Sequence, residues 1–353
     1  MKDRKEKPPS YPGERQHLLL APVTPAIAGI TEGLQNAASG ANAWQRKPAQ
    51  FPYFYWERSQ RILMEYGKTQ LTASAPSPDR LVQLWRELEQ GTEHDIDMFF
   101  YVLSAFYLSR DQAAWIWAKD FLNTRGIEPK KTREGYRAGH RGEDIDKVET
   151  SLYRLESIWV TIWASEPKGK KRYVLEGRLI NILDRWSQES LDGEEKLPVA
   201  WLVQPGDGLQ EYLRHFPSFA YLCKKVLSYD PYREVWEKRL ARYFFFHLRF
   251  HGGGELRRSV KELLEANALP IDRRNPERTR ARLEKCLNQL RQDGFIDNWL
   301  YPDQSSLPAR GWLEEWKQRI ILISAAPKTD LTQPLPSLAL ASPGPRRRSR
   351  RRK

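Results

Sequence analysis

A pattern of predicted elements occurs twice in this chain, and the duplication limits the possible folds more than any other feature of the sequence. The segment FLNTRGI (121–127) has an apolar pair, three residues, a small residue and an apolar residue, and LLEANAL (263–269) repeats that order. Each segment closes a predicted helix and is followed by a loop, a further helix and a strand. Because repeated patterns indicate repeated structural units, we expect two units of one design.

The last helix of each expected unit has apolar residues that recur every three or four positions and therefore lie on one face. They are Val148, Leu152 and Leu155 in the first unit, and Leu283, Leu287 and Leu290 in the second. After the first of these helices, SIWVTIWAS (157–165), the basic turn EPKGKK (166–171) and RYVLEGRLINIL (172–183) predict a β-hairpin. FIDNWLY (295–301) predicts a strand after the second.

Helices followed by a β-hairpin are typical of a winged helix, whose third helix can lie in a DNA major groove. We therefore expect a mostly α-helical chain with small β-hairpins, an α+β fold, organised as two tandem winged-helix domains flanked by disordered tails. Residues 51–190 form the first expected domain, with an N-terminal extension, and residues 191–327 the second. Residues 1–50 are rich in Pro, Gly, Ala and Asn, and residues 328–353 in Pro, Ser and then Arg, so both segments are expected to be disordered.

The net charge favours a polyanionic partner, either nucleic acid or an acidic membrane surface. The formal net charge is +13, of which the last eight residues contribute +7 and the first fifty +3. The remaining body is only mildly basic, so composition alone is weak evidence that this body binds DNA. The basic residues 346–353 would bind polyanions without sequence specificity, and DNA, RNA, anionic lipid or an import receptor fit them equally well.

The stretch NPERTRARLEKCLNQLRQDGFI (275–296) is the third helix of the second expected unit. Pro276 suits its first turn and Asn275 its N-cap, while Leu283, Cys286, Leu287 and Leu290 face the core. Its basic residues gather at the start of the helix and in the preceding loop, where a recognition helix meets base edges: Arg273, Arg274, Arg278, Arg280 and Arg282. We expect all five to contact DNA.

The corresponding loop, helix start and hairpin turn of the first unit are also basic. The expected DNA-binding residues there are Lys130, Lys131, Arg133, Arg137, Arg141, Lys168, Lys170, Lys171 and Arg172. The expected nonspecific tail consists of Arg346, Arg347, Arg348, Arg350, Arg351, Arg352 and Lys353. Arginine clusters also occur on ordinary solvated helix faces, and Glu277, Glu284 and Asp293 share the second helix. The place of the cluster at the start of a third helix favours DNA contact.

With these residues, the chain resembles plasmid replication initiators built of two tandem winged-helix domains. The resemblance covers roughly residues 90–325 and rests on FLNTRGIEPKK…RGEDIDKVETSLYRLESIWVTI and on YDPYREVWEKRLARYFFFHLRF…LLEANALP…RTRARLEKCLNQLRQDGFI. It implies a non-catalytic protein that recognises repeated origin sites in double-stranded DNA, helps to open the duplex and recruits host replication proteins such as a helicase or loader. It also implies a shift between a homodimer and a DNA-binding monomer. The basic tail and the long N-terminal segment depart from the family.

No catalytic, cofactor or metal site is expected. His247 and His251 are four residues apart, but beyond Glu255 the sequence offers no third metal ligand near them, and packing is the simpler role. No His-x-His, Gly-x-Ser-x-Gly or complete phosphate loop occurs. Two isolated cysteines and the absence of an apolar run of ~20 residues indicate a cytoplasmic protein without a membrane span.

Three other functions remain open. A winged-helix transcriptional regulator would bind a single palindromic operator in place of clustered repeats. A DNA nuclease or strand-transferase with an unrecognised active site would cleave supercoiled DNA in the presence of divalent ions. An RNA-binding protein that depends on the tail would lose its affinity when residues 346–353 are deleted.

Overall fold

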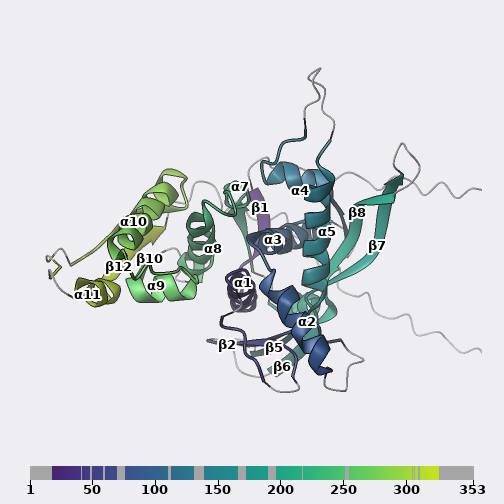
Figure 1. Ribbon diagram of the computed structural model, residues 1–353, viewed down its shortest axis with the longest axis horizontal. Helices are drawn as coiled ribbons and strands as arrows, with labels where there is room; N and C mark the ends of the chain where they lie inside the picture. Colours follow the sequence, from purple (N-terminus) through teal and green to yellow (C-terminus); the bar gives the residue numbers. More distant parts are fainter. Residues whose placement is uncertain are drawn as a thin grey trace, which may run out of the picture.

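The computed structural model describes most of the chain between residues 18 and 325, and Figure 1 shows it with its longest axis horizontal. The described residues are 18–40, 42–47, 50–58, 60–69, 76–109, 113–130, 139–165, 172–189, 196–216, 218–250, 254–303, 305, 307–308 and 311–325. Within these ranges, eleven helices and twelve strands form a mixed α/β fold, and the strands make four small antiparallel sheets. No described helix has the length and apolar character that crossing a membrane requires.

The disorder expected for residues 1–50 is wrong for the described part of that segment. Strand β1 (Leu18–Pro22) pairs with β9 (Phe219–Cys223), and helix α1 (Pro25–Ala37) is buried along most of its length. Helix α1 packs closely on a sheet, because a Cβ atom added at Gly29 or at Gly33 would lie 2.5 Å from Ile62 Cδ1 or from Met64 Sδ, respectively. The small residues that suggested disorder therefore permit close packing.

The sheet beneath α1 has the strand order β2-β3-β5-β6. Its strands are β2 (Tyr53–Glu57), β3 (Arg61–Tyr66), β5 (Ile158–Ser165) and β6 (Arg172–Arg178). The hairpin expected to complete the first winged helix is present as β5–β6, but it pairs with β3 through β5 and so belongs to this other sheet. Helix α6 (Asp207–His215) packs against β6, and Gly208 approaches the backbone of Glu176.

The first repeated unit completes its own sheet with a later hairpin. It consists of α3 (Glu93–Leu108), β4 (Ala114–Trp117), α4 (Ala118–Thr124), α5 (Gly142–Glu156), β7 (Ile180–Glu189) and β8 (Lys196–Pro205). The strand order is β4-β8-β7, so the last strand lies in the centre. Because β7 pairs with β8, these strands span the domain boundary expected between residues 190 and 191 and belong to one unit.

The second repeated unit has the same order of elements. It consists of α8 (Val235–Phe250), β10 (Glu255–Ser259), α9 (Val260–Ala266), α10 (Pro276–Gln292), β11 (Ile296–Leu300) and β12 (Ile320–Ala325). Its strand order, β10-β12-β11, again places the last strand in the centre. Five of the described helices lie outside this shared pattern: α1, α6, α2 (Pro78–Glu89), α7 (Lys225–Ser228) and α11 (Trp312–Gln318). Figure 1 shows α10 towards one end of the molecule and the β7–β8 hairpin towards the other, with α3 and α8 between them.

The second helices of the two units, α4 and α9, end in the same way, as the matched sequence segments predicted. Gly126 after α4 has φ 76°, and Ala268 after α9 has φ 49°, so both adopt the left-handed conformation. The next residue then bonds back into the helix: Ile127 N donates to Leu122 O at 3.0 Å, and Leu269 N donates to Leu264 O at 2.9 Å. The repeat therefore extends to the hydrogen bonds of this turn.

A buried ion-pair network, which we call the junction network, joins the first helices of the two units. Its six side chains are each less than 9% exposed: Glu93, Asp97, Arg125, Lys238, Arg239 and Arg242. Glu93 on α3 accepts hydrogen bonds from Arg239 Nε and Arg242 Nη1 of α8, both at 2.6 Å. Asp97, one turn later, accepts from Lys238 Nζ at 2.7 Å and from Arg242 Nη2 at 2.5 Å.

Candidate nucleic-acid interface

Helix α10 begins as the sequence predicted. The side chain of Asn275 caps it by accepting a hydrogen bond from Arg278 N at 3.2 Å, and Pro276 occupies the first turn. Asp272 Oδ1 accepts from the backbone N–H groups of Arg274 and Asn275, both at 3.0 Å, which fixes the loop before the helix. The apolar row is fully buried and consists of Leu283, Cys286, Leu287 and Leu290. One face of α10 is thereby held against the core, and the opposite face is left for solvent.

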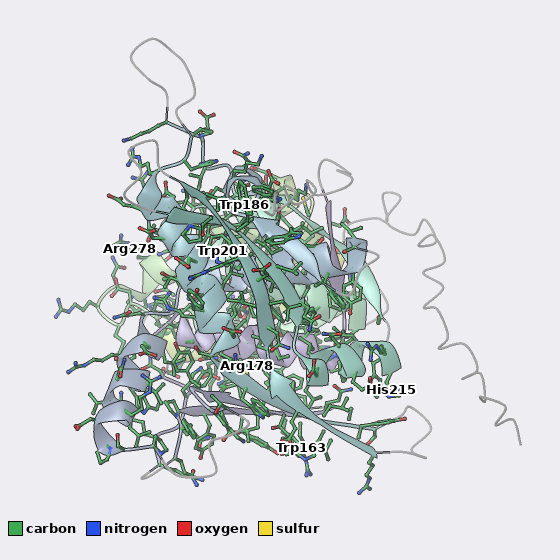
Figure 2. All side chains as sticks on the ribbon, turned by 90° about the vertical axis from the view of Figure 1, so that its right-hand side faces the viewer. Trp163, Arg178, Trp186, Trp201, His215 and Arg278 are labelled. Atoms are coloured by element: carbon green, nitrogen blue, oxygen red, sulfur yellow. The ribbon has the colours of Figure 1, made fainter. Side chains whose placement is uncertain are left out.

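The exposed face of α10 is basic and polar. One row of residues, spaced by three or four positions, lies opposite the buried row. Its five members are all exposed: Arg278, Ala281, Lys285, Asn288 and Gln292. Figure 2 shows Arg278 at the outer edge of the molecule. Arg282 is exposed beside this row, with its guanidinium 4.9 Å from the centre of the Trp236 ring. We call these six side chains the α10 face.

Arg280 does not join this face, contrary to the sequence-based expectation. Its Nε atom donates to Glu284 Oε1 at 2.9 Å, and both side chains are about two-thirds buried. The hydrogen bond and charge of Glu284 raise the pKa of Arg280. The positive charge of Arg280 is therefore balanced within the helix. Arg273 and Arg274, in contrast, are exposed in the loop before α10.

The sequence pattern contained a signal for residues of the α10 face that were not singled out. Lys285 lies seven positions after Arg278, and Asn288 and Gln292 continue that spacing. All three positions lie opposite the apolar row, so a helical projection alone places them with Arg278.

In the first unit, the structure describes three of the nine basic residues expected to bind DNA. Lys130 and Arg141 are exposed, and they flank the loop before α5. Arg172 is exposed at the start of β6, in the four-stranded sheet and not in the sheet of the first unit. The others lie outside the described residues, as does the basic tail: Lys131, Arg133, Arg137, Lys168, Lys170 and Lys171, with residues 346–353.

Helices α5 and α10 occupy equivalent places in the two units but carry opposite charge. Residues 276–292 of α10 contain five basic and two acidic side chains, whereas residues 142–156 of α5 contain two basic and five acidic ones. The first half of α5 exposes Glu143 and Asp146 to solvent, and Asp144 pairs with Lys147 at 3.3 Å. Because DNA phosphates repel carboxylates, α10 suits a DNA groove and α5 does not.

Among the described residues, no group of three His, Cys, Asp or Glu side chains could hold a metal ion. His251 lies outside the described residues, and the ring of His247 packs 4.0 Å from that of Tyr243, centroid to centroid.

Comparisons with known proteins found no matching family model and no matching curated protein. Among solved structures, the chain is similar to domains 2 and 3 of RctB. One crystal structure of these domains, a selenomethionine derivative, is 13% identical with a TM-score of 0.40, and the match covers 84% of this chain and 99% of that chain. Another is 14% identical with a TM-score of 0.42, covering 84% and 97%. Nothing about the α10 face follows from so distant a likeness.

Proposed function

We propose that this chain is a sequence-specific double-stranded DNA-binding protein that inserts α10 into the major groove. We further propose that its repeated units are winged helices and that it acts as a replication initiator of a plasmid or mobile element. The observation that supports the proposal best is the α10 face, a solvated basic row on the third helix of a helix–strand–helix–helix–strand–strand unit.

The dimensions and chemistry of α10 suit a major groove. A helix with side chains is about 10–12 Å across, and the groove is about 12 Å wide. Arg278 and Lys285 can donate to guanine, and Ala281 between them can contact a thymine methyl group. Arg273 and Arg274, in the loop before the helix, are placed to contact phosphates, and the N–H groups at the start of α10 add attraction for anions.

The difference in charge between the two units bears on the kind of DNA site that the chain recognises. A palindromic operator mirrors the two-fold symmetry of a dimer. Two units of the same design within one chain differ in charge at α5 and α10, so a single chain is not symmetric on DNA. Chains that each present α10 would read direct repeats when bound in the same orientation and a palindrome when paired as a two-fold dimer, so the arrangement of the selected sites separates an initiator from a regulator.

The test is selection of bound duplexes from a random pool, followed by footprinting at moderate salt. Variants R278A and K285A should then bind the selected site roughly 5- to 150-fold more weakly, which corresponds to ~1–3 kcal/mol for a base contact, and should lose preference at single positions. The matched control is R291A, which removes an exposed arginine from the other side of α10. R291A should bind as the wild-type chain does.

Two results would contradict the proposal. If R278A and K285A keep wild-type affinity and base preference, α10 does not recognise DNA. If the selected sequences form one palindrome and do not support replication of a plasmid that lacks its own initiator, the initiator role is wrong and a regulator is the better assignment.

A further inference from the structure

Two tryptophans from neighbouring elements contact side chains of the α10 face. Trp236 on α8 lies beside Arg282, and Trp299 on β11 lies beside Asn288. Arg282 and Asn288 are six positions apart, so with about 3.6 residues per turn they point in directions roughly 120° apart. The two tryptophans therefore contact the α10 face on different sides.

The contact with Trp299 fixes which way round the Asn288 amide lies. The distance between Trp299 Nε1 and the side-chain oxygen of Asn288, Oδ1, is 3.1 Å. An indole N–H can only donate a hydrogen bond, so the amide atom that it meets is the oxygen and not the nitrogen. Trp299 is half-buried on a strand that pairs with β12, whereas Asn288 is exposed. The carbonyl side of the amide is thus turned towards β11, and Nδ2 remains to contact a base.

An asparagine held in this way acts as a donor to DNA. Asparagine reads adenine by turning both amide atoms to one base edge, so that Oδ1 accepts from adenine N6 and Nδ2 donates to adenine N7. With Oδ1 turned towards Trp299, that arrangement would break the hydrogen bond. Guanine presents two acceptors in the major groove, O6 and N7, and needs only donors. Asn288 therefore suits guanine better than adenine.

Trp236 holds Arg282 without using the hydrogen-bonding groups of the arginine. The guanidinium carbon lies over the Trp236 ring, 4.9 Å from its centre, within the ~6 Å of a cation–π contact. Trp236 is 3% exposed, so its ring has little freedom to move, whereas Arg282 is exposed. A guanidinium stacked on a ring keeps its N–H groups at its edge. Arg282 is thus oriented before DNA binds and can still donate to guanine O6 and N7.

Glu237 adds an attraction on the side of α10 that faces α8. Burial raises the pKa of Glu237, and the charges of Arg282 and Lys285 partly oppose that rise. The carboxylate therefore lies within electrostatic reach of two cations of the α10 face. Its attraction for Arg282 restricts the arginine to the side of the helix on which Trp236 lies.

We propose that Trp299 and Trp236 are positioning residues that give α10 a preference for guanine at two base pairs, an inference that rests on the proposed DNA-binding function. Asn288 Nδ2 donates to one guanine and Arg282 to the other. Six residues advance a helix by about 9 Å, and base pairs follow one another every ~3.4 Å, so the two side chains face different base pairs. Each tryptophan acts through the side chain that it contacts.

The test uses the duplex selected from the random pool, with each G·C pair changed in turn to A·T. N288A should lose the preference for guanine at one base pair. W299F keeps an aromatic ring but removes the indole N–H, and it should weaken the same preference about fivefold. Because its charge is unchanged, W299F should keep the affinity for random duplexes and the salt slope. The double variant N288A/W299F should bind as N288A does.

A second pair of variants tests the other tryptophan. R282K keeps the positive charge but loses the flat guanidinium, so it should keep the salt slope and lose the preference for guanine at another base pair by at least about fivefold. W236L should weaken that same preference in the wild-type chain and leave it unchanged in R282K. The matched control is W312F, which exchanges a half-buried tryptophan of α11 and should bind as the wild-type chain does.

The outcomes separate this inference from the proposed function. Adenine in place of guanine at the base pair that N288A affects overturns the inference. So does a folded W299F or R282K variant that keeps the wild-type preference at every base pair. If R278A and K285A still weaken binding in that case, α10 recognises DNA and only the role of the two tryptophans is wrong. If R278A and K285A also bind as the wild-type chain does, the proposed function itself fails.

Discussion

At the scale of single residues, Asp97 shows how one carboxylate can hold two halves of a molecule together. It is fully buried and bonds Lys238 and Arg242 of α8 and Arg125 after α4. Burial opposes its ionisation, but the charges of these three side chains outweigh that effect and lower the pKa of Asp97. The carboxylate is therefore ionised, and its partners depend on its charge.

We predict that D97N lowers the free energy of unfolding by about 3–5 kcal/mol, because removal of one charge leaves its buried partners uncompensated. The measurement is urea denaturation followed by circular dichroism. The control is E89Q, which breaks the exposed Arg46–Glu89 pair at 2.8 Å and should cost less than about 1 kcal/mol. A D97N variant as stable as E89Q would show that the junction network contributes little.

His94 should make the fold sensitive to acid. Burial, followed by the charge of Arg125, lowers its pKa from 6.5 to about 3, and its Nδ1 atom lies 2.8 Å from Ser151 Oγ. The unfolded chain therefore takes up a proton near pH 6.5 and the folded chain only near pH 3. We predict that stability falls as pH drops through this window, by up to about 1.4 kcal/mol per pH unit from this group.

The variant H94N tests this assignment because asparagine can still donate to Ser151 but does not titrate. Urea denaturation at several pH values between about 4 and 6.5 should give a shallower dependence for H94N than for the wild-type chain. Parallel curves would mean that another group, such as Asp97 with its lowered pKa, is responsible for the loss of stability in acid.

At the scale of elements, the matched ends of α4 and α9 predict opposite effects of one exchange. Ala268 adopts φ 49°, which costs an L-residue with a side chain roughly 1–2 kcal/mol, whereas Gly126 adopts φ 76° freely. We predict that A268G raises the free energy of unfolding by up to about 1 kcal/mol and that G126A lowers it by about 1 kcal/mol. A Cβ atom at residue 126 would meet Ser228 Cβ at an ordinary 3.8 Å, so the cost there is conformational.

Chemical denaturation of A268G and G126A side by side shows whether each variant raises or lowers the free energy of unfolding. If A268G is destabilised, the flexibility that glycine adds to the unfolded chain outweighs the relief of strain, and the two turns differ in energy despite their shared hydrogen bonds.

The elements also show which parts of the fold local sequence can determine. The helix starts, the repeated turn and the buried row of α10 follow from spacing and capping residues within one or two turns. The assignment of β5–β6 to the first unit was wrong because the sequence of a hairpin does not show which sheet the hairpin joins. Only long-range pairing, such as that of Met64 with Val160, shows that β5 joins β3. The residue pattern within one strand does not show which other strand it pairs with.

The candidate interface and the junction network also differ in how far the sequence can predict them. The core-facing row of α10 predicts its exposed face, and the pairing of Arg280 with Glu284 follows an ordinary i,i+4 spacing that the sequence contains. The junction network could not be predicted, because Lys238 lies 141 residues after Asp97 and each helix alone offers charged residues without partners. Its formation depends on how α3 and α8 meet.

At the scale of the whole molecule, attraction to DNA and recognition of sequence are expected to come from different parts of the chain. Residues 346–353 contain seven of the basic side chains, without an apolar residue among them, whereas the α10 face has three basic side chains on a helix with a fixed orientation. A run of basic side chains can contact phosphates of any sequence. Oriented side chains on a helix can distinguish base edges.

We therefore predict that replacing residues 346–353 with a glycine–serine segment of equal length weakens binding to selected and random duplexes by similar factors. The magnitude of the slope of log K against log salt should fall by as much as about 6, since each lost phosphate contact contributes ~0.9. Fluorescence anisotropy over a salt series measures both quantities, and the ratio of specific to nonspecific affinity should be unchanged. K285A should have the opposite effect, reducing that ratio while changing the slope by no more than about one. If tail replacement removes the preference for the selected site, the arginines of the tail take part in sequence recognition, and α10 is insufficient for it.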